Sequence, residues 1–157
     1  MKALTLTQPW ATLVAIGAKR IETRSWTTNY RGPLAIHAAK TAPGWSAALA
    51  VQEPLASVLA HAGISEFPVG CVIATCRLIG VHRMPPSFTE AMEHPGWEWV
   101  GPTGRDFSFP LTEQERAFGD YMILRYAWLL ADVQPLLAPV PARGQLGLWE
   151  WDEISTK

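Results

Sequence analysis

The fold and the candidate site of this chain both depend on one stretch of sequence, Gly17-Ala18-Lys19-Arg20-Ile21-Glu22-Thr23-Arg24, hereafter the octet. Gly17 is suited to ending a helix, because glycine readily adopts the left-handed conformation of helix C-termini. A strand is predicted from Lys19 to Trp26, in which side chains two positions apart share a face. Glu22, Arg24 and Trp26 would then point the same way, with Lys19 reaching over their face. Such a cluster can bind a polar heteroaromatic group, position a water molecule or form an internal ion-pair network.

Basic residues are concentrated around the octet. Residues 1–45 hold six basic residues and one acidic residue, whereas residues 46–157 hold seven basic and thirteen acidic residues. This distribution favours an anionic or electron-rich ligand near the octet, although folding can also interleave the two parts of the chain. The formal net charge of the whole chain is only −1, so a general polyanion-binding protein is not expected.

The length and composition predict one globular domain with its own core, since the 157 residues are 48% hydrophobic and 17% charged. No apolar run is long enough to cross a membrane, and the first residues lack the apolar region of a signal peptide, so a cytoplasmic location is expected. Cys71 and Cys76 are expected to be buried free thiols, because their spacing in a strand places them on opposite faces. No metal site is expected, because no ligand spacing occurs among His37, His61, His82 and His94.

Short segments separated by 13 prolines and anchored by eight tryptophans predict a small, mostly β barrel with added helices. Besides the octet strand, strands are predicted at residues 4–6, 33–39, 69–81, 121–133 and 143–151. Helices are predicted at residues 9–16 and 43–62, the second interrupted near Pro54. The strand at 33–39 is expected to pair with the octet strand as a hairpin, and residues 135–141 are expected to form a spacer.

A long segment rich in Pro, Gly, Trp and acidic residues precedes the strand at 121–133. It is predicted to form an ordered insertion at about 84–118, with short helices near residues 87–93 and 112–118. Long excursions of this kind often form the lids or walls of sites.

The octet fits the pattern Gly-x-Lys-x-x-Glu-x-Arg and resembles the signature of the ASCH domain family, small barrels related to the RNA-binding PUA domains. Other segments resemble the bacterial ASCH proteins of the EOLA-like group, namely Leu6–Ala11, Glu22–Trp26, Tyr30–Pro33, Ile36–Ala38, Arg125–Trp128 and Gly144–Trp149. Together they cover nearly the whole chain except residues 43–65 and 84–118. The resemblance implies a single ASCH (PUA-like) domain over residues 1–157. Its fold class would be α+β, mainly β, with a barrel of five or six strands, flanking helices and a cleft lined by the octet.

The resemblance also implies a function. At the level of the family it implies RNA or nucleotide binding and, in some small members, hydrolysis of the acyl amide of N4-acetylcytidine. Those deacylases have a lysine at the position of Lys19 and a hydroxyl residue at the position of Glu22. This sequence departs from them, because it has a glutamate at the position of the hydroxyl residue. Thr23 is the neighbouring residue and lies on the opposite face of the strand. A threonine nucleophile therefore cannot be carried over.

Lys19 and Glu22 are the candidate catalytic residues. Lys19 could act as a general base or as an electrophilic clamp, and Arg20 and Arg24 are available to lower its pKa. Glu22 could activate a water molecule or accept a hydrogen bond from the amino group of a cytosine. The structural alternative is an ion-pair network that orders the barrel, with Glu22 paired to Arg24 or Arg143.

Candidates for ligand binding come from several parts of the chain: Arg24, Trp26, His37, Tyr126, Trp10 and Gln145. The aromatic rings could stack on a base, although most tryptophans in a small domain belong to its core. A guanidinium beside a carboxylate favours an orienting role for Arg24. His37 could carry a proton, because its strand is expected to neighbour the octet. The glycine turn around Gln145 could offer backbone N–H groups to an oxyanion.

Two functions are compatible with these residues. The first is an amidohydrolase that removes the acyl group from N4-acylated cytidine or related small amides, with water as nucleophile and no cofactor. The second is a module that binds RNA or a modified nucleotide without chemistry, or a ribonuclease with Lys19 and His37 as acid and base. The acidic balance of residues 46–157 favours a single nucleoside-like ligand over a large RNA footprint. A protein-interaction role with a vestigial cleft is a third possibility.

Overall fold

Six strands form one curved sheet in a computed structural model that describes residues 1–84, 98–100, 106–108, 112–122 and 124–152. They are β1 (Lys2–Leu6), β2 (Ile21–Arg24), β3 (Gly32–Ala38), β4 (Cys71–Arg83), β7 (Tyr126–Pro141) and β8 (Leu148–Glu150). Their order is β2-β7-β4-β3-β1-β8, with β1 and β3 parallel and the other pairs antiparallel. The sheet is an open half-barrel with β2 and β8 as outer strands, which confirms the expected mainly β fold.

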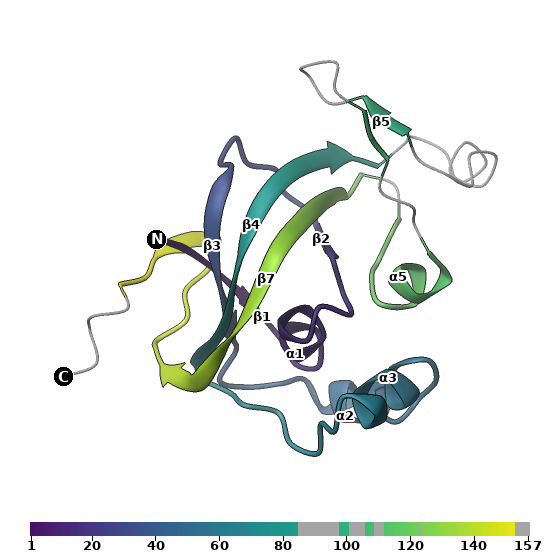
Figure 1. Cartoon of the computed structure of the whole chain (residues 1–157), viewed down its shortest axis with the longest axis vertical. Coiled ribbons are helices and arrows are strands. Elements are labelled where there is room, and N and C mark those ends of the chain that lie inside the picture. Colours follow the sequence, from purple (N-terminus) through teal and green to yellow (C-terminus); the bar gives the residue numbers. More distant parts are fainter. Residues whose placement is uncertain (85–97, 101–105, 109–111, 123, 153–157) are drawn as a thin grey trace.

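The helices lie on one side of this sheet. They are α1 (Trp10–Ala15), α2 (Gly44–Ala50), α3 (Leu55–His61) and α5 (Glu113–Ala117). Figure 1 shows the long strands β4 and β7 arching over α1, with α2 and α3 side by side beyond it. The break between α2 and α3 falls at Pro54, as predicted, because proline disfavours a helical conformation in the residue before it.

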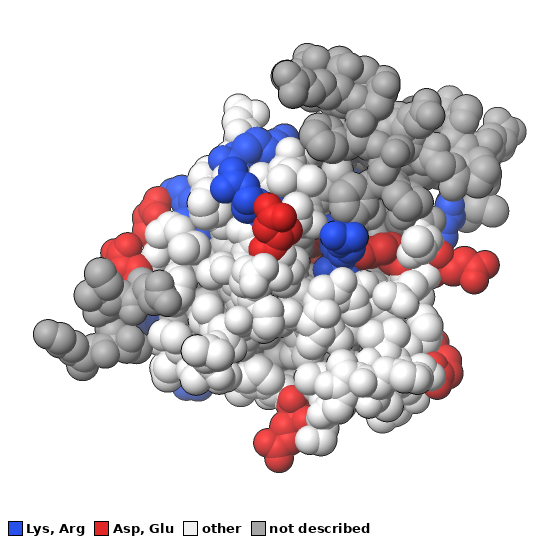
Figure 2. All heavy atoms as spheres, viewed as in Figure 1, with Lys and Arg blue, Asp and Glu red and all other residues white. Residues whose placement is uncertain are grey.

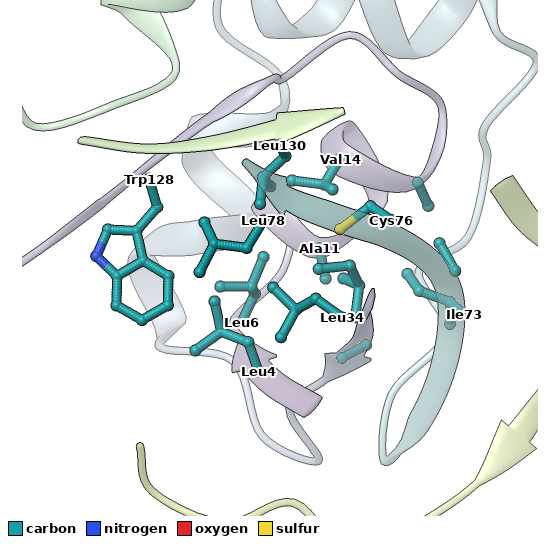
Figure 3. Close-up of a cluster of buried hydrophobic side chains, with 14 of the residues drawn as sticks. Leu4, Leu6, Ala11, Val14, Leu34, Ile73, Cys76, Leu78, Trp128 and Leu130 are labelled. Atoms are coloured by element: carbon teal, nitrogen blue, oxygen red, sulfur yellow. The ribbon is translucent and has the colours of Figure 1, made fainter. Parts of the chain in front are cut away.

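The main core fills the space between α1 and the concave face of the sheet (Figure 3). Leu4 and Leu6 of β1 point into it two positions apart, as the strand period requires. From α1, Ala11 and Val14 contact this core, while Leu13 belongs to a second cluster that includes residues of α3. The first helix is therefore held between the sheet and α3, which fixes the start of the octet.

The predicted hairpin between the octet strand and residues 33–39 is wrong. β2 pairs with β7, where Glu22 lies opposite Trp128, and β3 lies between β1 and β4. The chain crosses from β1 through α1 and β2 before it returns as β3 parallel to β1. The octet strand β2 is therefore an outer strand of the sheet, separated from β3 by β7 and β4.

The predicted strands at 121–133 and 143–151 differ in extent from the strands of the structure. β7 begins at Tyr126 and continues to Pro141, so residues 135–141 form part of a strand and not a spacer. The register of the β4–β7 pair shifts at three places, and such irregularities let a ladder accommodate prolines. The final strand covers only Leu148–Glu150 of the predicted 143–151.

Only parts of the predicted insertion at 84–118 belong to the described residues. Strands β5 (Glu98–Val100) and β6 (Asp106–Ser108) form a separate two-stranded sheet, and α5 confirms the helix expected near residues 112–118. The helix expected near residues 87–93 lies outside the described residues. Cys71 and Cys76 are buried free thiols, as expected. Within the described ranges, no helix combines the length and apolar character needed to cross a membrane.

Candidate functional site

The amino group of Lys19 is buried beside the start of β2. The backbone N–H of Lys19 donates to the carbonyl of Leu13, and Gly17 adopts the left-handed conformation that ends α1 (φ 75°). Only 1% of Lys19 is exposed. Its Nζ donates hydrogen bonds to the carbonyl oxygens of Ile21 (2.6 Å) and Phe118 (2.7 Å). The C-terminal end of α5 therefore covers the amino group of this octet residue.

Glu22 lies between this amine and Arg24. Its carboxylate oxygens are 3.7 Å from Nζ of Lys19 and 3.8 Å from Nε of Arg24. Arg24 also donates to the carbonyl of Thr5 over 2.9 Å, which ties β2 to the far strand β1. The predicted mixed-charge cluster of Lys19, Glu22 and Arg24 is therefore present, with the carboxylate at its centre.

Glu115 is a second carboxylate near the amine, and sequence reasoning missed it. It is only 6% exposed and accepts a hydrogen bond from the backbone N–H of Arg20. Burial lowers the pKa of Lys19 below its ordinary value of 10.5, and the carboxylates of Glu22 and Glu115 oppose this shift. Of the two causes that can lower the pKa of a lysine, desolvation and nearby cations, desolvation is the one that acts here, and Arg20 and Arg24 make no contribution to the shift.

A pocket of about 460 Å³, hereafter the Lys19 pocket, opens beside this cluster. It is lined by Trp10, Lys19, Glu22, Thr23, Arg24, Trp45, Leu49, Ala117, Phe118, Gly119, Asp120 and Arg125. Trp10 and Trp45 meet edge to face at its wall, with ring centroids 5.4 Å apart. Trp45 is 57% exposed, so α2 contributes an accessible aromatic surface that the sequence analysis did not single out.

A smaller pocket of about 290 Å³, hereafter the Trp26 pocket, adjoins the first, because both are lined by Trp10, Glu22 and Arg24. Of these two pockets, only the Trp26 pocket is lined by Trp26 and Gln145. The predicted common face of Glu22, Arg24 and Trp26 is therefore observed, although β2 itself ends at Arg24. The Arg24 guanidinium lies 5.9 Å from the centroid of the Trp26 ring, within the range of a cation–π contact.

Two predicted ligand-binding residues lie elsewhere. His37 lines a third pocket of about 950 Å³ instead of the Lys19 pocket, because β3 does not neighbour β2. The prediction that its strand neighbours the octet is therefore wrong, and its pairing with Lys19 as the acid and base of a ribonuclease has no support in its position. Tyr126 packs against the main core and lines none of these three pockets. Its predicted contact with a ligand has no support in its position.

The surface around the site carries charges of both signs. On the face shown in Figure 2, basic and acidic side chains lie close to one another beside a broad uncharged area. This agrees with the near-neutral net charge and fits a ligand held in a pocket better than one spread over a basic surface. Among the residues that the structure describes, no three His, Cys, Asp or Glu side chains gather as a metal site would require.

Comparison with known proteins places this arrangement in a family. A search of curated proteins finds no match. The crystal structure of ASCH from Zymomonas mobilis aligns with a TM-score of 0.46 and 18% sequence identity, over 89% of this chain and 72% of that chain. The model of the ASCH domain matches residues 4–135, which include the octet and all or part of five of the six strands of the main sheet. Because this match covers most of its length, the chain belongs to the ASCH domain family.

Proposed function

We propose that this protein hydrolyses the acyl amide of N4-acylated cytosine nucleosides in the Lys19 pocket. The observation that carries the proposal is the environment of the Lys19 amine, which is buried, hydrogen-bonded to two carbonyl oxygens and adjacent to a carboxylate. The family offers RNA or nucleotide binding as the broader function. The specific reaction is taken from the resemblance to the small deacylases of this family, and the groups at the site have the chemistry that it requires.

The two carbonyl acceptors suit a neutral lysine that acts as a base. A neutral amine has two N–H bonds and one lone pair. If the N–H bonds go to the carbonyls of Ile21 and Phe118, the third position, on the side of Glu22, is the one from which the ammonium loses its proton, and the hydrogen bond to Glu22 opposes that loss. Burial favours this neutral form, because desolvation disfavours the charged one. The site therefore supports a general base poised beside a carboxylate.

The reaction needs water and no cofactor. Glu22 accepts a hydrogen bond from a water molecule, Lys19 takes one of its protons, and the water oxygen attacks the acyl carbon. The C–N bond then breaks, and Lys19 returns the proton to the N4 nitrogen. The products are a carboxylic acid and the free amino group of cytosine. Glu22 can also accept a hydrogen bond from that amino group, which is the usual contact of a carboxylate with cytosine.

The aromatic wall supplies a surface for the base. Trp10 and Trp45 line the Lys19 pocket together with the charged cluster, and base–aromatic stacking contributes about 1–3 kcal/mol per base. The pocket volume of about 460 Å³ lies within the range of sites for small organic ligands. Both features favour a nucleoside-sized ligand.

The direct test is to incubate the protein with N4-acetylcytidine and to follow the ultraviolet change on conversion to cytidine. Release of acetate in equal amount, measured separately, would establish hydrolysis. If cytidine compounds bind but no acetate forms, the protein is a nucleotide-binding module without this chemistry. If neither binding nor turnover occurs, the proposed function is wrong.

The pH dependence of kcat/KM distinguishes the two possible roles of Lys19. A general base must be neutral, so we expect kcat/KM to rise with pH and to level off above the pKa of Lys19, which burial holds below 10.5. An ammonium that polarised the carbonyl would give the opposite trend, with kcat/KM falling as the amine loses its proton. Initial rates across this pH range decide between them.

Replacing Trp45 with alanine is expected to raise KM for N4-acetylcytidine about 5- to 150-fold, which corresponds to the loss of one base–aromatic stacking contact. The side chain is largely exposed and takes no part in the proposed proton transfer, so kcat should change little. Trp45→Phe is the matched control, since it retains a stacking surface and should restore most of the affinity. Equal KM values for wild type and Trp45→Ala would exclude stacking at this wall.

A further inference from the structure

The third and largest pocket, hereafter the His37 pocket, has no role in the chemistry proposed above. Its volume is about 950 Å³, and none of its lining residues is acidic. Lys40 and Arg143 both line it and are exposed. Neither of them forms an ion pair with any residue that the structure describes. A pocket with two unneutralised cations and no carboxylate favours an anionic ligand.

Buried polar groups at the base of this pocket have unused hydrogen-bonding capacity. His37 is 1% exposed, and its Nε2 donates to the carbonyl of Ala142 over 3.0 Å, so Nδ1 carries the lone pair of the neutral ring. Nδ1 has no partner in the structure. The hydroxyl of Thr5 accepts a hydrogen bond from Trp149 over 3.1 Å, which leaves its own hydrogen available to a ligand. The base of the pocket thus offers one donor for a phosphate oxygen, the Thr5 hydroxyl, and one acceptor for a hydroxyl group of the ligand, Nδ1 of His37.

The backbone at Gly144 lies directly against these groups. A Cβ atom at this position would be 2.4 Å from Cε1 of His37 and 3.0 Å from the hydroxyl of Thr5. Contacts this short exclude any larger residue unless the ring moves. Glycine therefore lets the 142–146 segment cross close over His37 and present Arg143 and Gln145 at the rim.

The His37 pocket is continuous with the proposed active site. Thr5, Gln145 and Leu146 line both the His37 pocket and the Trp26 pocket, and the Trp26 pocket shares Glu22 and Arg24 with the Lys19 pocket. Thr5 is the junction, because its carbonyl accepts from Arg24 while its hydroxyl faces His37. This succession of shared lining residues is the path that one extended ligand would follow.

We propose that the His37 pocket binds a phosphate group of a nucleotide whose base occupies the Lys19 pocket. Lys40 and Arg143 would neutralise the phosphate, Thr5 would donate to one of its oxygens, and the sugar would cross the Trp26 pocket. The inference rests on the proposed function for the position of the base. It adds that a nucleotide binds more tightly than the free nucleoside. The phosphate could be the monoester of a mononucleotide or a diester within an RNA strand.

Binding measurements without turnover test this inference separately from the hydrolysis. The probes are cytidine, cytidine 5′-monophosphate and a short single-stranded cytidine oligonucleotide, titrated by calorimetry at fixed ionic strength. We expect the monophosphate or the oligonucleotide to bind about tenfold or more tightly than cytidine, because charge-assisted hydrogen bonds to phosphate are among the stronger ones. Preference for the oligonucleotide indicates a strand phosphate, and preference for the monophosphate indicates a terminal one.

The double variant Lys40→Ala/Arg143→Ala should remove this preference and leave the affinity for cytidine unchanged. The matched control is Lys2→Ala/Arg77→Ala, which removes one lysine and one arginine that do not line the His37 pocket. If cytidine binds as tightly as its phosphorylated forms, or if both double variants behave alike, the phosphate site is wrong. If the preference holds while N4-acetylcytidine is not hydrolysed, the phosphate site stands and the proposed hydrolysis fails.

Discussion

Replacing Lys19 with methionine is expected to lower kcat/KM for N4-acetylcytidine by roughly 10²- to 10⁴-fold, the usual contribution of a positioned general base. Methionine is unbranched and apolar, so it can follow the same buried path while it lacks a proton acceptor of comparable basicity. In the proposed mechanism the amine, which is buried and near Glu22, carries the proton from water to N4. Initial rates of cytidine formation measure the effect.

The fold should survive this change, and the control must show that it does. Methionine leaves the carbonyls of Ile21 and Phe118 without their donor, at a cost of about 1–3 kcal/mol per unsatisfied group. Removal of a buried, desolvated amine offsets part of that cost. Lys2→Met is the matched control, because Lys2 is half-exposed and pairs with Glu150 away from the pocket. Unchanged hydrolysis in a folded Lys19→Met variant would exclude Lys19 as the base.

The local part of the site could be predicted from sequence because it depends on strand geometry alone. The alternation of side chains along a strand places Glu22 and Arg24 on one face whatever the strand pairs with. The same holds for the helix end at Gly17, whose left-handed conformation needs no distant partner. The octet therefore predicted the cluster of Lys19, Glu22 and Arg24 correctly.

The parts that failed depend on contacts between distant segments. β2 finds its partner in β7 about a hundred residues later, and no local signal favoured that pairing over a hairpin with β3. The expected position of His37 beside the octet depended on that hairpin. The wrong pairing of the two strands therefore also gave a wrong position for His37. Strand pairing follows from which faces bury apolar surface, and that is decided by the whole chain.

Glu115 shows how a local signal can mislead. Thr112 and Glu115 have the spacing of a capping box, and the Thr112 hydroxyl does accept from the backbone N–H of Glu115. That pattern predicts that the glutamate side chain turns back to the start of its own helix. Instead its carboxylate accepts from the backbone N–H of Arg20. Only the docking of α5 against the octet brings this acidic group to the site.

Replacing Trp128 with alanine is expected to reduce the free energy of unfolding by about 3–5 kcal/mol, the usual cost of deleting a buried tryptophan side chain. Trp128 is fully buried in the main core (Figure 3). Its ring meets Trp26 edge to face with centroids 4.6 Å apart, and its indole N–H donates to the Trp26 carbonyl over 3.3 Å. Urea unfolding followed by circular dichroism gives the free energy directly.

The same substitution should also disturb the site, because Trp128 lies opposite Glu22 in the β2–β7 ladder and its ring packs against Trp26. We therefore expect weaker ligand binding even where the variant is still folded. Trp45→Ala is the matched control, since that tryptophan is 57% exposed and its loss should cost only about 0.5–1.5 kcal/mol, the usual contribution of an aromatic pair such as its contact with Trp10. A stability loss for Trp128→Ala no larger than that of Trp45→Ala would contradict the position of Trp128 in the core. The pair of variants thus separates a tryptophan that holds the site in place from one that contacts the ligand.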